Sequence, residues 1–547
     1  MLLIAALLLT SAEPAPVPTG MELLYGDRLP LGPDGEPTVA IGIATGESRV
    51  TLRVRDAQLD FYQRGVLRTA QPRAGATIEV SILRSRKALR RHYVDVAGAP
   101  FGDPEGLERA AQDWTARGYD VEVLEEGTAL GIGGRVIDTR QYRLVLPTAS
   151  QESARRLAER VHAETGERAF VKSRIETLPW ASLRIDVDGA PIGVATSYAR
   201  LTSFDHETLT VRDVSFGKGY AHAGREDRHY RGELYVVVDA DGRLAVVNVL
   251  GAEELLRGVV PSELFASAHP EALRAQAVAA RNQLFAKLGT RHHSDPFHLC
   301  SHQHCQVYTG TNREDPRTDQ AIADTRGELL FHRERLVDTV YSSTCGGHTE
   351  NNDAVWGNAA DPALRGRPDF DEDAHPELAS YADGIERSEL RSWVNSTPAT
   401  YCSQASKVSR KKFRWRRAFT QGEIDALVVR RFPQVGSVKA LHVVNRGPGG
   451  RVMTLRIKGT RGEASLLHEL AVRRMFSNLE SGAFVIERGT DGGFVFVGGG
   501  WGHGVGMCQL GAIGRAESGH DYRSILRHYY NGAVTVPVYG TSISQRD

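Results

Sequence analysis

The order of strand-forming and helix-forming segments between residues 89 and 175 limits the possible folds of this chain more than any other pattern. Apolar and polar residues alternate in the strand-forming segments, whereas the segments between them have helical periodicity. The predicted elements are strands at 93–97, 119–124, 142–146 and 168–172, and helices at 104–117 and 151–164, the second capped by Ser150. Strand–helix–strand twice over predicts a ferredoxin-like βαββαβ module.

The segments on either side of this module set the rest of the architecture. Residues 21–88 contain period-two runs, such as 50–55 and 76–82, which predict a β-rich support module. The chain has 547 residues, a length that allows about three or four domains. We therefore expect an α+β, multidomain protein in which residues 176–540 follow the module as a further region.

The N-terminus has the pattern of an export signal. Residues 2–9 are apolar but too few to span a bilayer, and residues 10–12 are small, as at a cleavage site. No Lys or Arg precedes the run, so a start further upstream or a simple hydrophobic tail is the alternative. We expect residues 1–20 to be a signal peptide or hydrophobic leader. The protein is then exported to the periplasm or cell envelope, with no transmembrane segment in the mature chain.

The charges of the chain balance, with 67 Lys plus Arg against 67 Asp plus Glu. No overall field therefore favours nucleic acid or an anionic membrane. Residues 410–417 are strongly basic, but their alternating pattern and the predicted export favour a solvated strand over a nucleic-acid site. We expect no nucleic-acid partner.

Glu263 is the strongest candidate for chemistry. It follows the apolar residues 259–261 and precedes a helix that Pro270 would begin, because proline suits the first helical position. Apolar neighbours disfavour a charged carboxylate and raise its pKa, so the group stays protonated near neutral pH. Such a carboxyl can act as a general acid on a glycosidic bond. The alternative is an ordinary surface glutamate beside a helix.

Several segments, in one order, carry a family resemblance. They are YRGEL at 230–234, RLAVVNVL at 243–250, GVVPSE at 258–263, LRAQAVAAR at 273–281, YSSTCGGHTEN at 341–351, VWG at 355–357, and GWGHGVGM at 500–507 with Gln509 and Gly511. Together they resemble the SpoIID family, the group of stage II sporulation protein D and the amidase enhancers. The resemblance covers roughly residues 180–540 and implies that residues 176–540 are a SpoIID-type catalytic domain of mixed α/β fold.

The resemblance implies a lytic transglycosylase, a peptidoglycan lyase that cleaves the β-1,4 bond between N-acetylmuramic acid and N-acetylglucosamine. Protonated Glu263 would donate to the bridging oxygen and then take the proton of the muramic C6 hydroxyl, which closes a 1,6-anhydro ring. One residue serves both steps, so the second carboxylate of ordinary glycosidases is not required. Arg281 lies at a family position associated with the active site and would hold substrate oxygens or tune Glu263, unless it is a solvated helix-surface arginine.

Further groove residues follow from the same motifs. Trp501 would stack on a sugar face and His503 would supply a hydrogen-bonding group, because glycines around them allow close backbone approach. The alternative is a glycine-rich turn with a core tryptophan; a phosphate loop is excluded by the missing Lys-Ser/Thr. Tyr308, His348 and Glu350 are further substrate-binding candidates, each of which has a purely structural alternative.

A cluster of five His and two Cys lies between residues 292 and 305. Imidazole and thiolate are the usual zinc ligands, and some members of the resembled family carry zinc on a similar segment. The predicted ligands of a structural zinc ion are His293, Cys300, His304 and Cys305, with His292, His298 and His302 as competitors. A Cys300–Cys305 disulfide, a polar loop or a catalytic metal are the alternatives.

The three remaining cysteines are Cys345, Cys402 and Cys508. A Cys345–Cys402 disulfide is chemically sensible after export, although connectivity does not follow from sequence. Cys345 stands at a motif position where relatives of the resembled family also use Ser, so a nucleophilic role is not expected.

Two features of residues 89–175 are a turn with Gly98 and Phe101 and the run YRLVLPTASQESARRL at 142–157. With them the module resembles the SPOR domain, which binds peptidoglycan glycan that has lost its stem peptides; a structural module of the same fold is the alternative. The resemblance implies peptide-stripped glycan strands as substrate and a cell-wall amidase as a partner. Two rival functions stay open: a non-catalytic glycan-binding protein or enhancer of an N-acetylmuramoyl-L-alanine amidase, and a zinc hydrolase.

Overall fold

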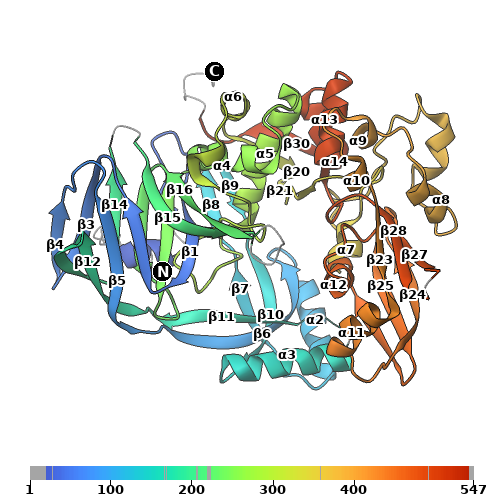
Figure 1. Cartoon of the computed structure of the whole chain (residues 1–547), viewed down its shortest axis with the longest axis horizontal. Helices are drawn as coiled ribbons and strands as arrows, with labels where there is room; N and C mark the ends of the chain where they lie inside the picture. Colours follow the sequence, from blue (N-terminus) through green and yellow to red (C-terminus); the bar gives the residue numbers. More distant parts are fainter. Residues whose placement is uncertain are drawn as a thin grey trace, which may run out of the picture.

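The computed structural model describes residues 20–26, 29–165, 167, 169–204, 207–217, 223–357, 359–490 and 492–540. The expected leader at residues 1–20 lies, except for Gly20, outside this part. Helices and strands are mixed throughout several packed layers, as expected for a multidomain α+β chain (Figure 1). In the described part, no helix is long and apolar enough to cross a membrane.

A pair of β-sheets forms one side of the molecule (Figure 1). One sheet has the order β19-β1-β18-β17-β14-β3-β4 and the other β13-β12-β5-β2-β15-β16. The strands are β1 (Thr38–Glu47), β2 (Arg49–Arg53), β3 (Ala57–Gln63), β4 (Val66–Ala70), β5 (Thr77–Arg86), β12 (Trp180–Val187), β13 (Ala190–Thr196), β14 (Tyr198–Ser203), β15 (Leu209–Phe216), β16 (Gly224–Tyr230), β17 (Glu233–Val238), β18 (Leu244–Gly251) and β19 (Leu299–Cys300), with α1 (Gly20–Tyr25) nearby.

These sheets join segments that the sequence analysis assigned to different modules. β1 pairs antiparallel with β18, with Thr38 opposite Gly251, and β5 pairs antiparallel with β12. Residues 21–88 therefore share two sheets with residues 180–251 rather than forming a body of their own. The side chains between the sheets, such as Val39, Leu183 and Val246, build the largest apolar core.

Residues 89–175 lie between these two halves in the sequence and form their own antiparallel sheet of order β11-β6-β10-β7. The elements are β6 (Leu89–Pro100), α2 (Pro104–Ala116), β7 (Glu122–Glu126), β8 (Ala129–Ile132), β9 (Arg135–Asp138), β10 (Gln141–Thr148), α3 (Gln151–Thr165) and β11 (Phe170–Thr177). Asp103 caps α2 by accepting from the Gly106 amide. Trp114 of α2 and Val161 of α3 share an apolar core with the sheet.

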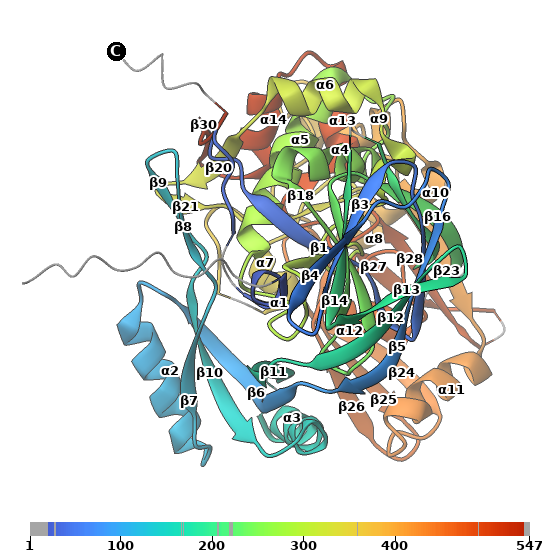
Figure 2. The same ribbon diagram turned by 90° about the vertical axis from the view of Figure 1, so that its left-hand side faces the viewer.

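The β8–β9 hairpin is an insertion that the sequence patterns did not show. It leaves the module and lies beside β21 (Figure 2). Ile132 and Ile137 are buried in the large core of the paired sheets, and the Arg135 guanidinium lies 5.5 Å from the ring centroid of Phe331. The module is therefore anchored to the remainder of the protein by apolar packing.

Helices and short strands cover one edge of the paired sheets and contain most of the motifs that carry the family resemblance. They are α4 (Ala252–Glu263), α5 (Pro270–Lys287), η1 (Gly310–Arg313), α6 (Pro316–Asp324), β20 (Glu328–His332), β21 (Arg335–Leu336), β22 (Tyr341–Ser342), α7 (Asn352–Trp356), α9 (Tyr401–Gln404), β29 (Met507–Cys508), α13 (Gln509–Glu517), α14 (Tyr522–Tyr529) and β30 (Ala533–Pro537). Nearly every side chain of α5 is buried, as expected for a central helix.

A third group of strands lies on the far side of these helices (Figure 1). Two three-stranded sheets, β23-β28-β27 and β24-β25-β26, pack with short helices around an aromatic-rich core. The elements are η2 (Pro376–Tyr381), α8 (Leu390–Asn395), α10 (Arg410–Phe413), β23 (Arg414–Phe419), α11 (Gln421–Arg431), β24 (Val438–Arg446), β25 (Val452–Gly459), β26 (Glu463–Leu467), α12 (Glu469–Met475), β27 (Phe484–Arg488) and β28 (Phe494–Gly499). The basic run at 410–417 thus spans α10 and part of β23.

Candidate active site

Glu263 is the last residue of α4, a helix that the sequence analysis did not predict, and the expected helix from Pro270 follows it as α5. Pro261 lies inside the final turn, and the Ser262 hydroxyl donates to the Gly258 carbonyl over 2.7 Å. The Glu263 carboxylate is half-buried, and its Oε1 accepts a hydrogen bond of 2.8 Å from the Val307 amide. One oxygen is therefore fixed by the backbone, and Oε2 is the oxygen available for proton transfer.

The environment of Glu263 favours its protonated form. Burial raises the pKa of the carboxyl above its ordinary value, while the Val307 hydrogen bond and the charge of Lys287 oppose that rise. Lys287 ends α5, and burial lowers its own pKa to about 8. A carboxyl with a raised pKa beside a cation can exist in both protonation states during a reaction.

Three glutamines hold the surroundings of Glu263 in place. Gln509 Nε2 donates to the Glu263 carbonyl over 2.9 Å and to Gln276 Oε1 over 3.2 Å. Gln306 Nε2 donates to the Ala280 carbonyl over 3.0 Å and lies 3.4 Å from the Tyr341 hydroxyl. Motifs far apart in the sequence therefore meet around one carboxylate. Gln276 and Gln509 stood within or beside quoted motifs, whereas Gln306 carried no signal of its own in the sequence.

Asp338 and Tyr341 extend this site. Burial raises the pKa of the Asp338 carboxyl, and the charge of Lys287 opposes that rise. Burial, and then the charge of Glu263, raise the pKa of the Tyr341 phenol. Sequence reasoning missed the roles of Lys287 and Asp338, because neither lies in a recognisable spacing with Glu263.

The glycine-rich motif joins the site through backbone pairing. β22 and β29 run parallel, with Tyr341 opposite Met507, and the Thr344 and Trp501 backbones form an isolated bridge. Trp501 is 39% exposed, and the Lys412 ammonium lies 5.5 Å from its ring centroid. Gly504 has φ 74°, and a Cβ there would lie 2.1 Å from the Arg451 guanidinium, so only glycine fits.

His503 lies beside Trp356, with 5.2 Å between ring centroids, and its Nδ1 accepts from the Val505 amide over 3.1 Å. Burial, followed by the charges of Arg451 and Arg473, lowers its pKa to about 3. The imidazole is therefore neutral at physiological pH. It can donate or accept a hydrogen bond but does not supply a positive charge.

Arg281 differs from both sequence interpretations, because it neither reaches Glu263 nor faces solvent. Its side chain has no exposed surface and forms two hydrogen bonds, of 2.7 and 2.8 Å, with the Glu253 carboxylate. Further donors point to the carbonyls of Ile322 and Glu328. These contacts assign Arg281 to a buried ion pair that joins α4 to α5, rather than to the substrate.

Tyr308, His348 and Glu350 also differ from the expectation that they line a groove, because all three are buried. The Tyr308 hydroxyl donates to Asn248 Oδ1 over 2.8 Å. The His348 Nδ1 lies 2.7 Å from the Thr349 carbonyl, and Glu350 Oε2 accepts from the Arg451 amide over 3.2 Å. Their polar atoms are used inside the protein, which leaves Trp501 and His503 as the accessible members of the predicted set.

The histidine–cysteine segment forms a compact cluster. One donor atom from each of His292, Cys300, His304 and Cys305 lies within 4.8 Å of the others. The His304 Nδ1 is 3.8 Å from Cys300 Sγ and 3.7 Å from Cys305 Sγ, and His292 Nε2 is 3.3 Å from Cys305 Sγ. Ordinary zinc–sulfur and zinc–nitrogen bonds in a tetrahedron give a sulfur–nitrogen separation of about 3.6 Å. The residues therefore fit a four-coordinate zinc ion.

The structure selects His292 where the sequence favoured His293. His292 has φ 58° and directs Nε2 into the cluster, while its Nδ1 lies 2.8 Å from Asp295 Oδ2. A carboxylate on the second ring nitrogen is typical of zinc-binding histidines. His293 instead points to the module, with Nε2 3.5 Å from Glu126 Oε1.

Two other candidates for the cluster lie elsewhere. His298 Nδ1 accepts from the Ala40 amide over 3.0 Å, and the exposed His302 is outside the group of four. Cys300 and Cys305 are free thiols, as are the three other cysteines, all of which lie in the described part of the chain. The disulfides considered from the sequence are therefore absent from these residues.

Comparison with known proteins supports the resemblance. Residues 240–332 match the family described as stage II sporulation protein, and residues 350–506 match a domain of unknown function. An uncharacterized protein of Brachyspira hyodysenteriae is 28% identical over 307 residues, which cover 56% of this chain and 72% of that protein. Stage II sporulation protein D of Bacillus subtilis is 27% identical over 309 residues, covering 54% and 75% of the two chains. The amidase enhancer of the same organism is 27% identical over 298 residues, which cover 51% of this chain and 40% of that protein.

Proposed function

This chain belongs to the SpoIID family, and from that premise we propose that it is a lytic transglycosylase that cleaves peptidoglycan glycan strands and leaves 1,6-anhydro-muramic ends. The observation that carries the proposal is the state of Glu263: a half-buried carboxyl with a raised pKa, one oxygen held by the Val307 amide and the other available to substrate. A cell-wall role agrees with the relatives named above, and envelope localisation follows from the same role.

The geometry of Glu263 suits both halves of the reaction. In the first half, the proton on Oε2 moves to the bridging oxygen between N-acetylmuramic acid and N-acetylglucosamine as that bond breaks. In the second half, the carboxylate accepts the proton of the muramic C6 hydroxyl while the C6 oxygen bonds to C1 of the same sugar. The Val307 amide and Lys287 stabilise the intervening carboxylate, because both lower the pKa that burial raises.

Sugar binding is assigned to the exposed part of the site. The Trp501 indole supplies an apolar face for a sugar ring, and neutral His503 supplies a hydrogen bond. The Tyr341–Met507 pairing and the Thr344–Trp501 bridge join the motif that contains both residues to the motif that begins at Tyr341. We assign Asp338 to positioning Lys287 rather than to attack on the sugar.

A zinc ion at His292, Cys300, His304 and Cys305 would have a structural role, because four protein ligands leave no open coordination position. When bound, it crosslinks the loop that follows α5. Val307 lies two residues after Cys305, so the same loop sets the position of the amide that donates to Glu263. The Lys287 ammonium donates to the Cys305 carbonyl over 2.5 Å and joins the helix to this loop.

We assign residues 89–175 to binding of peptide-stripped glycan, as a SPOR-like module would do. Its four-stranded antiparallel sheet with two helices on it supports this assignment. A cell-wall amidase that removes stem peptides is then a functional partner. The rival assignment, a non-catalytic enhancer of such an amidase, draws on the similarity to the amidase enhancer of Bacillus subtilis.

Digestion of purified sacculi separates these functions. Intact sacculi and sacculi stripped of stem peptides are incubated with the full chain, and the released fragments are analysed by mass spectrometry. Anhydro-muramic ends support the transglycosylase, reducing ends indicate a hydrolase, and no new ends indicate a binding protein or enhancer. A preference for stripped sacculi supports the glycan assignment of the module.

A further inference from the structure

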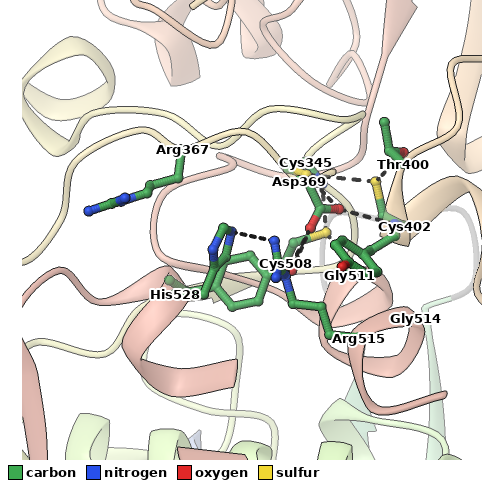
Figure 3. Close-up of polar contacts among 12 residues, drawn as sticks. Cys345, Arg367, Asp369, Thr400, Cys402, Cys508, Gly511, Gly514, Arg515 and His528 are labelled. Carbon is green, nitrogen blue, oxygen red and sulfur yellow. Dashed lines mark hydrogen bonds and ion pairs between the residues drawn. The ribbon is translucent and has the colours of Figure 1, made fainter. Parts of the chain in front are cut away.

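A second group of potential metal ligands lies in the interior, away from the histidine–cysteine loop. Cys345, Asp369, Cys402 and Cys508 come from four separate segments, and all four side chains are buried. One donor atom from each lies within 4.8 Å of the others. Figure 3 shows three sulfur atoms and the Asp369 carboxylate directed toward one point.

The distances agree with a single small ion. Cys345 Sγ is 3.7 Å from Cys402 Sγ and 3.5 Å from Asp369 Oδ2. A tetrahedral zinc ion with ordinary bond lengths separates two sulfur ligands by about 3.8 Å, and a sulfur from an oxygen by about 3.6 Å. A disulfide requires sulfur atoms about 2.05 Å apart. It would also leave the third sulfur and the carboxylate buried without a function.

Hydrogen-bond donors are directed at all three sulfur atoms. Cys508 Sγ accepts hydrogen bonds from the amides of Cys345, over 3.1 Å, and Gly511, over 3.3 Å. Cys345 Sγ accepts from the Gly347 amide over 3.4 Å, and the Thr400 hydroxyl lies 3.4 Å from Cys402 Sγ. Donors aimed at sulfur stabilise negative charge on it.

Hydrogen bonds from the protein also orient the carboxylate of Asp369. Its Oδ1 accepts from the Tyr529 hydroxyl over 2.6 Å and lies 3.8 Å from Nε of the buried Arg515. Its Oδ2 accepts from the Cys402 amide over 3.1 Å and faces the sulfurs. A ligand whose second atom is held by the protein is the usual arrangement around a metal, and Arg515 offsets part of the negative charge.

We propose that Cys345, Asp369, Cys402 and Cys508 bind a second zinc ion, which has a structural role. Three thiolates favour a soft or borderline ion over magnesium or calcium. The buried position and four protein ligands leave no site for substrate. The ion crosslinks the loop after β22, which contains Cys345, to β29, which contains Cys508, and so fastens the motif that begins at Tyr341 to the motif that ends at Met507.

Metal analysis of the full chain tests this proposal. The protein is purified without reductant, saturated with Zn²⁺ and freed of loosely bound ion, and zinc is measured per chain. We expect two zinc ions, of which Cys300→Ser/Cys305→Ser removes one and Cys402→Ser/Cys508→Ser removes the other. In the Cys300→Ser/Cys305→Ser background, Co²⁺ should give thiolate-to-metal charge-transfer absorption that Asp369→Asn shifts and Cys402→Ser weakens.

Two measurements on the unmodified protein test the proposal even if the variants fail to fold. X-ray absorption at the zinc edge should find five sulfur ligands shared between two ions, whereas the loop cluster alone supplies two sulfurs to one ion. Alkylation in denaturant, followed by mass spectrometry, should modify all five cysteines. A disulfide among Cys345, Cys402 and Cys508, or a single zinc ion that only Cys300→Ser/Cys305→Ser removes, overturns the proposal.

Discussion

The Val307 amide donates a hydrogen bond of 2.8 Å to Oε1 of Glu263, across 44 residues of sequence. This contact connects the end of α4 to the loop that follows the histidine–cysteine cluster. In the proposed reaction, Oε2 carries the transferred proton. The proposed chemistry of Glu263 and the proposed metal loop are therefore linked through one backbone atom.

Replacing Glu263 with Gln should abolish formation of anhydro-muramic ends while the protein folds normally. Glutamine keeps the size and the acceptor for Val307 but has no transferable proton, so the rate should fall by at least about 100-fold. Fragment release is measured by mass spectrometry and folding by circular dichroism. Glu254→Gln, in the first turn of the same helix, is the matched control and should retain activity.

The pH dependence of activity should show the raised pKa of Glu263. The first step requires the protonated form, so activity falls as the pH rises through this pKa, and that fall should lie at higher pH than for an ordinary glutamate. Between the unfolded and the folded pKa the native state binds more protons, so stability also decreases with rising pH in that window. In denaturant titrations at several pH values, the free energy of unfolding of Glu263→Gln should no longer show this decrease. If it falls with pH as steeply as in the unmodified protein, the raised pKa of Glu263 is contradicted.

Two neighbouring histidines give a sharp test of the loop cluster. His292→Ala should lower zinc content by about one ion per chain and reduce the melting temperature, because structural zinc binding contributes directly to folding. His293→Ala should retain the zinc, since its ring contacts Glu126. Zinc content and thermal unfolding are measured for both. Loss of the ion from the His293 variant alone would restore the ligand set expected from the sequence.

Arg281 should matter for stability rather than for substrate. Arg281→Met leaves the buried Glu253 carboxylate without its partner, so we expect a loss of about 3–5 kcal/mol in the free energy of unfolding. The double variant Glu253→Gln/Arg281→Met should recover part of it, because the unpaired charge is gone. Urea unfolding gives these values. A folded Arg281→Met protein with normal stability and no activity would favour the catalytic assignment instead.

Much of the local structure could be predicted from the sequence. The order of strands and helices in residues 89–175, the helix that begins at Pro270 and the chemical suitability of Glu263 follow from periodicity, proline geometry and apolar neighbours. Each of these signals depends on residues close together in the chain. The resemblance of the motifs to the family also indicated which distant segments belong to one site.

Only the tertiary structure decided which side chains reach one another. His292 and His293 are chemically identical, and the choice between them depends on a left-handed backbone at His292 and on Glu126 from another segment. Arg281 became a buried partner of Glu253 because α4 and α5 pack together, a contact that spacing along one helix does not encode. The gathering of Cys345, Cys402 and Cys508 likewise depends on long-range packing, since burial and distance between remote segments are properties of the folded chain alone.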